Sequence, residues 1–151
     1  MKRQARISVL SILLILLIAA AAVFTGCTQP TTGNETGLPY GVTEIVAERD
    51  LGAGDTTFTF TVVNGEGKAT VYTIQTNASD LRTALTEHGL IPAGKPGDLV
   101  NTVDGITADW SVDQGWWMLA AGGSTEMLNY GVDDAAITEG ADYAFIYKKG
   151  F

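Results

Sequence analysis

The sequence of 151 residues predicts an α+β domain in which one helix packs on one face of a mixed β-sheet. Three observations predict this class. Residues 56–63 alternate threonine with apolar side chains, as half-buried strands do, and residues 78–88 instead repeat apolar side chains with a helical period. Glycine-punctuated apolar segments then continue to residue 149, so strands lie on both sides of a single helix in the chain.

The first strands fall in residues 43–76. A weak strand is expected at 43–49, TEIVAER, ahead of the alternating segment TTFTFTVV at 56–63. The sequence NGEGK at 64–68 supplies asparagine and glycine, which tolerate positive φ angles, and a second strand segment follows at 69–76. We therefore predict a β-hairpin with a turn of four or five residues.

A single helix is predicted at about residues 78–88. Its inward face carries residues spaced at i, i+3, i+4 and i+7, namely Leu81, Ala84, Leu85 and His88. Asn77 is the expected N-cap, with Asp80 three residues later, and Gly89 is the expected C′ residue. The helix therefore presents one stripe of side chains to the sheet.

Further short strands are predicted after the helix. They comprise DLVNTVDGI at 98–106, QGWWMLA at 114–120, a short apolar piece at 127–130 and DYAFIYKK at 142–149. Glycines separate these segments at turn positions. The mixed sheet is therefore expected to combine strands that precede the helix with strands that follow it.

Residues 1–26 are expected to be an export signal, because three cations precede an uncharged apolar run at 7–24. The following VFTGC resembles a bacterial lipobox, although Phe24 stands where leucine is usual. That resemblance implies cleavage before Cys27 and a diacylglycerol on its sulfur. The alternative is a retained transmembrane helix that ends near an ordinary thiol.

Residues 27–42 are rich in threonine, proline and glycine and lack an apolar period, so we expect a flexible tether there and a folded domain at 43–151. Two acyl chains or more would give a stable anchor. The domain is expected to be extracytoplasmic, lipid-anchored at a bacterial or archaeal cell surface. The lone cysteine excludes an internal disulfide, so the core must stabilise the domain.

The charge of the chain limits its partners. Without its leader the chain keeps six of its nine lysines and arginines against 17 acidic residues, a net charge of −11. This negative electrostatic field would repel phosphate groups, so it argues against nucleic acid as a partner and against flat binding to anionic lipid. We expect a soluble head that the tether holds away from the membrane surface.

Catalysis is not expected, because the folded domain has one histidine and no thiol. A Cys-His dyad is excluded, and a Ser-His-Asp triad would depend on His88. The position of His88 at the C-terminal end of the predicted helix gives it an electrostatic role instead. We predict that the protein is not an enzyme and requires no covalently bound cofactor.

Four segments together are similar to a known family. They are TFTFTVVNGEGKATVYTIQTNASDLRTAL, DLVNTVDGITADW, QGWWMLAAGG and GVDDAAITEGADYAFIY. Their order and spacing resemble the DUF4430 domain, the transcobalamin-like C-terminal domain, over about residues 43–147. The resemblance implies a β-grasp-like fold of the soluble-ligand-binding type, with cobalamin, another corrinoid or a comparable small molecule as the ligand.

Two features depart from the family. MLAAGGS replaces a tyrosine-rich strand, which leaves fewer polar and aromatic contacts after Trp117. Asp142 lies one position away from the family's second carboxylate, and a one-residue shift in a strand reverses the face to which a side chain points. Vitamin-carrying members complete the site with a helical barrel, so the resemblance implies weak capture alone, or a site shared with a transporter or another surface protein.

Aromatic side chains carry the binding hypothesis. The residues assigned to ligand binding are Trp110, Trp116, Trp117, Tyr130 and Asp109. Neighbouring residues of a strand point to opposite faces, so Trp116 and Trp117 cannot both enter the same core. We expect Trp117 to pack under the helix with Leu81 and Leu85, and Trp116 to face outward with Met118; the reverse assignment would expose Trp117.

Two alternatives to small-molecule capture stay open. One is a surface domain that binds Ca²⁺ through loop carboxylates, which are hard oxygen ligands. The candidates are Asp104, Asp109, Asp113, Asp133, Asp134, Glu139 and Asp142. None of these segments matches an EF-hand loop, so no specific metal site is predicted.

The other alternative is an adhesion or assembly module that binds another protein through an exposed sheet edge and the outward tryptophan.

Overall fold

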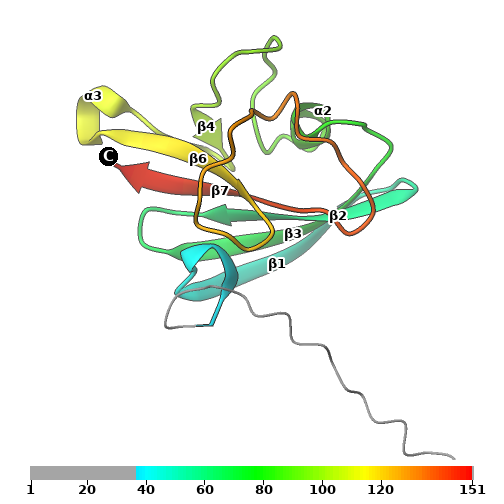
Figure 1. The fold of residues 1–151 in the computed structure, drawn as a ribbon, viewed down its shortest axis with the longest axis horizontal. Coiled ribbons are helices and arrows are strands. Elements are labelled where there is room, and N and C mark those ends of the chain that lie inside the picture. The colour runs from blue at the N-terminus through cyan, green and yellow to red at the C-terminus, as the bar shows by residue number, and fades with distance from the viewer. Residues whose placement is uncertain (1–36, 151) are drawn as a thin grey trace, which may run out of the picture. The chain divides into compact units, whose positions relative to one another are not determined.

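The computed structural model describes residues 37–150 of the chain (Figure 1). The chain divides into two units, residues 1–30 and 31–151, and only the second contains described residues. The expected export signal and Cys27 lie outside the described part, as does most of the expected tether. Among the helices of residues 37–150, none is long and apolar enough to cross a membrane.

The described elements run in the order 3-10 helix, three strands, helix, two short strands, short helix and two strands. Their bounds are η1 Pro39–Gly41, β1 Glu44–Gly52, β2 Thr56–Val63, β3 Lys68–Thr76, α2 Leu81–Glu87, β4 Thr102–Val103, β5 Ile106–Thr107, α3 Trp110–Asp113, β6 Gly115–Ala121 and β7 Asp142–Lys149.

The main sheet is mixed and open, with five strands in the order β1-β3-β2-β7-β6. The β2–β3 and β6–β7 pairs are antiparallel, whereas β1–β3 and β2–β7 are parallel. The first strand of the hairpin thus lies beside the C-terminal strand, with α2 on one face of the sheet (Figure 1). The predicted α+β, β-grasp-like class is confirmed.

The hairpin formed by β2 and β3 is confirmed, and its turn shows why. Asn64 accepts hydrogen bonds at Oδ1 from the amides of Glu66 and Lys68, at 2.9 and 3.0 Å. Gly67 takes a φ of +79°, which costs glycine little. The side chain of Asn64 therefore closes the turn around a residue that needs a left-handed backbone.

The helix α2 is confirmed, but it is shorter than predicted and begins at a different cap. Asp80 is the N-cap, since its Oδ1 accepts from the amide of Thr83 at 2.9 Å. The expected cap, Asn77, instead accepts from the amide of Asp55 at 3.0 Å and closes the turn between β1 and β2. Gly89 follows the helix with a φ of +68°, as predicted for its C′ residue.

The loops after the helix differ from the prediction. Only β4 and β5 form where a strand was expected at 98–106, because Asp104 and Gly105 take positive φ angles and turn the chain back. The predicted strand at 127–130 is wrong: this segment is irregular and meets β6 through one hydrogen bond, from the amide of Leu128 to the carbonyl of Leu119 at 2.9 Å. The short helices η1 and α3 were not predicted.

The sheet is covered on both faces. The larger cluster lies between the sheet and α2, and it includes Phe58, Phe60, Tyr72, Leu81, Leu85 and Phe145. The second cluster lies on the opposite face, where Tyr40 and Val42 are buried against Val63, Met118 and Ile146. The end of the expected tether is therefore part of the packed domain, and η1 lies on the side of the sheet away from α2 (Figure 1).

Candidate ligand-binding pocket

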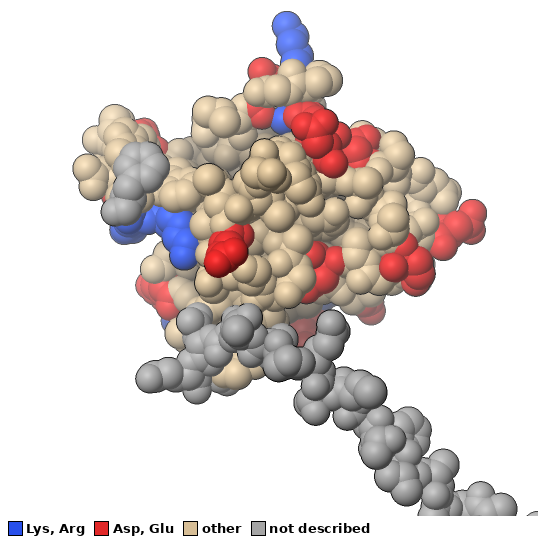
Figure 2. Space-filling model, viewed as in Figure 1, with Lys and Arg blue, Asp and Glu red and all other residues tan. Residues whose placement is uncertain are grey.

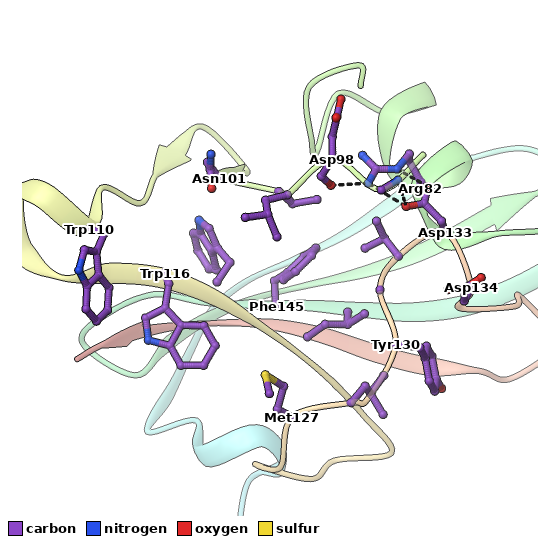
Figure 3. Close-up of a pocket in the computed structure, with 18 residues that line it drawn as sticks. Arg82, Asp98, Asn101, Trp110, Trp116, Met127, Tyr130, Asp133, Asp134 and Phe145 are labelled. Atoms are coloured by element: carbon purple, nitrogen blue, oxygen red, sulfur yellow. Dashed lines mark hydrogen bonds and ion pairs between the residues drawn. The ribbon is translucent and has the colours of Figure 1, made fainter. Parts of the chain in front are cut away.

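A pocket of about 550 Å³ opens over β6 and β7, next to the first turn of α2 (Figure 3). Its walls come from α2, the loop 97–101, α3, the strands β6 and β7, and the loop 127–134. Side chains of aromatic and aliphatic residues form most of the wall, and Figure 3 shows Trp116, Phe145 and Met127 around its apolar centre. The size and the apolar lining are typical of sites for small molecules.

The tryptophan pair divides between the two faces of β6, as the alternation of a strand requires. Trp117 is 8% exposed and packs in the α2-side cluster, with its ring edge-to-face with Phe145 and Tyr147 at centroid distances of 6.3 and 5.1 Å. Its buried indole Nε1 has no hydrogen-bond acceptor among the described residues. Trp117 is therefore the inward ring, as expected.

Trp116 lies on the other face of β6, but it does not simply face solvent. It is half-buried against the second cluster, and its Nε1 donates to the carbonyl of Gly150 at 2.8 Å. Met118 shares its face, as expected, and is buried. Both tryptophans still line the pocket, although they lie on opposite faces of the edge strand β6.

The rim of the pocket is apolar and exposed. Eight large apolar side chains are exposed among residues 37–150, and four of them line this pocket: Leu99, Trp110, Met127 and Tyr130. Leu99 is 87% exposed, and the others are between 40 and 64% exposed. Exposed apolar side chains that gather around a cavity are typical of binding surfaces.

An ion pair forms one end of the pocket (Figure 3). Arg82 holds Asp133 through both Nε and Nη2, the latter at 3.0 Å, and Nη2 also donates to the carbonyl of Asp98 at 2.7 Å. The amide of Gly97 donates to Asp133 as well, at 3.0 Å. The guanidinium of Arg82 lowers the pKa of Asp133, and the carboxylate raises the pKa of Arg82 in turn.

Four of the five residues assigned to binding line this pocket, and Asp109 does not. Asp109 is the N-cap of α3, where its Oδ1 accepts from the amide of Ser111 at 2.8 Å and from its hydroxyl at 2.6 Å. These hydrogen bonds lower the pKa of Asp109. The carboxylate therefore fixes the short helix that carries Trp110.

The other acidic candidates are dispersed. Asp113 binds Tyr147 and Lys149, and Glu139 accepts from the amide of Thr57 at 2.7 Å. Asp142 begins β7 with its side chain towards the second cluster, and burial raises its pKa. Within residues 37–150, no three His, Cys, Asp or Glu side chains are grouped so that they could hold a metal ion.

His88, the histidine on which a triad would depend, ends α2 as its C-cap residue and does not line this pocket. Its Nε2 is buried without a hydrogen-bond partner in the described chain. An ideal Cβ at Gly52 would lie 2.8 Å from this nitrogen, so the imidazole packs directly on the backbone of β1. The structure thus gives His88 a packing role at the end of the helix.

No protein-family model matches the chain, and no curated protein matches it either. Among solved structures, the chain is similar to a protein from Ruminococcus gnavus to which metal binding has been provisionally ascribed. The two are 29% identical with a TM-score of 0.57, over 64% of this chain and 100% of the other. The chain is also similar to haptocorrin in complex with Cbi, at 17% identity and a TM-score of 0.46, over 67% of this chain and 27% of haptocorrin. The first similarity supports the α+β fold described above.

Proposed function

We propose that this protein is an extracytoplasmic lipoprotein whose β-grasp-like domain captures a small molecule and catalyses no reaction. The observation that carries the proposal is the pocket over β6 and β7, where three tryptophans from α3 and β6 and a tyrosine from the loop 127–134 meet around one apolar cavity. Flat rings provide a large contact area at little cost in conformational entropy. A ligand with a flat or ring-shaped apolar body suits this wall.

The anchor is part of the proposal and rests on the sequence around Cys27. A diacylglycerol on that sulfur would hold the domain at the membrane. Changing Cys27→Ala is expected to abolish lipid attachment, because the chain has no other thiol to carry the diacylglycerol. Labelling with a radioactive fatty acid measures this directly, and label that persists in the variant would contradict the proposed anchor.

The ligand class comes from the family resemblance, which points to cobalamin or another corrinoid. The pocket is open on one side, so it would cover only part of so large a molecule. We therefore propose weak capture by this domain alone, or capture shared with a transporter or another surface protein.

Titration with cobalamin tests the ligand class. We expect saturable quenching of tryptophan fluorescence, because three of the five aromatic residues in the pocket wall are tryptophans. Cobalamin absorbs light, so N-acetyltryptophanamide at equal absorbance is the control. Quenching that only follows this control, without saturation, would contradict corrinoid capture.

Assembly with another protein is a second candidate, which the free edge of the sheet favours. β1 is an edge strand, and Ile45 and Val46 are 39 and 54% exposed on it. Such edges pair readily with another strand. Ligand capture predicts one molecular mass over a hundredfold range of concentration in analytical ultracentrifugation. A dimer that forms without ligand as the concentration rises would favour assembly.

A further inference from the structure

The ion pair between Arg82 and Asp133 at one end of the pocket bears on the chemical class of the ligand, an inference that rests on the proposed ligand pocket. Arg82 is 8% exposed and is the only lysine or arginine in the pocket wall. A guanidinium in the wall of an apolar pocket is ordinarily a site for a carboxylate or phosphate, because its planar donors match two oxygens.

In this protein Nε and Nη2 of the guanidinium already have partners. Asp133 takes two of its nitrogens in a two-pronged contact, and the carbonyl of Asp98 takes a further bond from Nη2 at 2.7 Å. The Asp133 side chain is held on its other side by the amide of Gly97. A ligand anion that bound Nε and Nη2 would have to displace a carboxylate that three donors already hold.

The remaining charges of the wall have the opposite sign. Asp98 and Asp134 are also among the residues that line the pocket, so three acidic residues accompany its one cation, although the Asp98 carboxylate points away from the cavity (Figure 3). Residues 37–150 contain six lysines and arginines against 16 acidic residues, and Figure 2 shows more acidic than basic side chains on the face it displays. The field at the pocket therefore repels anions.

We propose that Asp133 is a specificity-determining residue that neutralises Arg82, so that the pocket accepts neutral or cationic apolar ligands and rejects anionic ones. The exposed rings of Trp110 and Tyr130 at the rim suit such ligands, since aromatic faces bind both apolar rings and organic cations. Asp133 therefore acts by pairing with the guanidinium of Arg82, which is then not available to bind an anionic group of the ligand.

Three naphthalene probes of similar size test the proposal: 1-naphthaleneacetamide is neutral, 1-naphthaleneacetate is its near-isosteric anion, and 1-naphthylmethylamine is a cation. Equilibrium dialysis of the full chain, with the same detergent on both sides of the membrane, measures the affinities. The wild type is expected to bind the amide and the amine at least about tenfold more tightly than the acetate.

Two variants change this preference in opposite directions. Asp133→Asn exposes an uncompensated guanidinium and is expected to raise affinity for the acetate by about tenfold, with the amide within about twofold of the wild type. Arg82→Gln removes the one cation of the wall and leaves its three acidic residues, so it is expected to weaken acetate binding further. The double variant restores the wild-type net charge of the wall and is expected to restore the wild-type preference.

Asp134→Asn is the matched control, because Asp134 lines the same pocket without a bond to Arg82. It is expected to change acetate affinity by less than about threefold. A melting curve of each variant shows whether it folds, and the wild-type and Arg82→Gln measurements decide the matter if Asp133→Asn does not. Equal binding of acetate and amide by the wild type would overturn the charge selection alone, whereas binding of none of the probes would overturn the ligand pocket with it.

Discussion

Replacing Trp117 with alanine is expected to lower the free energy of unfolding by about 3–5 kcal/mol, the range for truncating a large buried aromatic side chain. Trp117 is almost fully buried, and its ring packs edge-to-face on Phe145 and Tyr147. The loss comprises the burial of the ring, the aromatic contacts and the cavity that remains. Urea denaturation followed by circular dichroism measures the change.

Trp117→Phe is the informative companion to this variant. It keeps an aromatic ring between Phe145 and Tyr147 and removes an indole N–H that has no acceptor among the described residues. On folding, this N–H loses its hydrogen bond to water without gaining another. Its removal therefore offsets part of the stability that the smaller ring loses in packing. We expect the phenylalanine variant to lose less than half as much stability as alanine. A loss below about 1 kcal/mol for Trp117→Ala would contradict the packing described here.

Trp110→Ala is expected to weaken binding of the ligand by about tenfold or more while leaving the fold stable. Trp110 is 47% exposed on a four-residue helix, so little of its surface contributes to the core, but its ring lines the pocket. Large aromatic side chains at the rim of a site often contribute 1–2 kcal/mol or more to binding, about a tenfold change. Titration with cobalamin or the naphthalene amide measures it, beside a melting curve.

Val112→Ala is the matched control for Trp110→Ala. Val112 lies on the same short helix and is 79% exposed, but it does not line the pocket. Its truncation is expected to change neither affinity nor melting temperature appreciably.

Trp116→Ala is expected to lower both the affinity for the ligand and the stability of the fold. Its ring lines the pocket, packs on the second cluster and donates a hydrogen bond to Gly150. Unchanged affinity in both tryptophan variants would remove the aromatic residues from the proposed site.

The regular elements could be predicted from the sequence because each has its own period. The alternation in 56–63 specified a strand, and the stripe of Leu81, Ala84 and Leu85 specified a helix. The predicted N-cap of the helix was wrong because Asn77 and Asp80 both have side chains suited to capping. Only the structure shows that Asn77 accepts a hydrogen bond from the amide of Asp55, while Asp80 caps the helix. Local signals thus determine that an element exists better than where it begins.

The pocket wall could be predicted only in part. The tryptophans were conspicuous, but Leu99 and Met127 lie on irregular loops whose positions depend on tertiary contacts. Arg82 was missed although a signal was present. A cation in the first turn of a helix faces the positive end of the helix dipole, so such an arginine calls for an anionic partner elsewhere, which the fold supplies as Asp133.

The segment 38–42 sets a practical limit on how far the chain can be shortened. Tyr40 and Val42 are each 2% exposed and cover apolar side chains of the strands β2, β6 and β7. A chain truncated at Thr43 would leave Val63, Met118 and Ile146 open to water on the face opposite α2. Such a fragment would be prone to aggregate, so a soluble form of the domain must begin before Leu38.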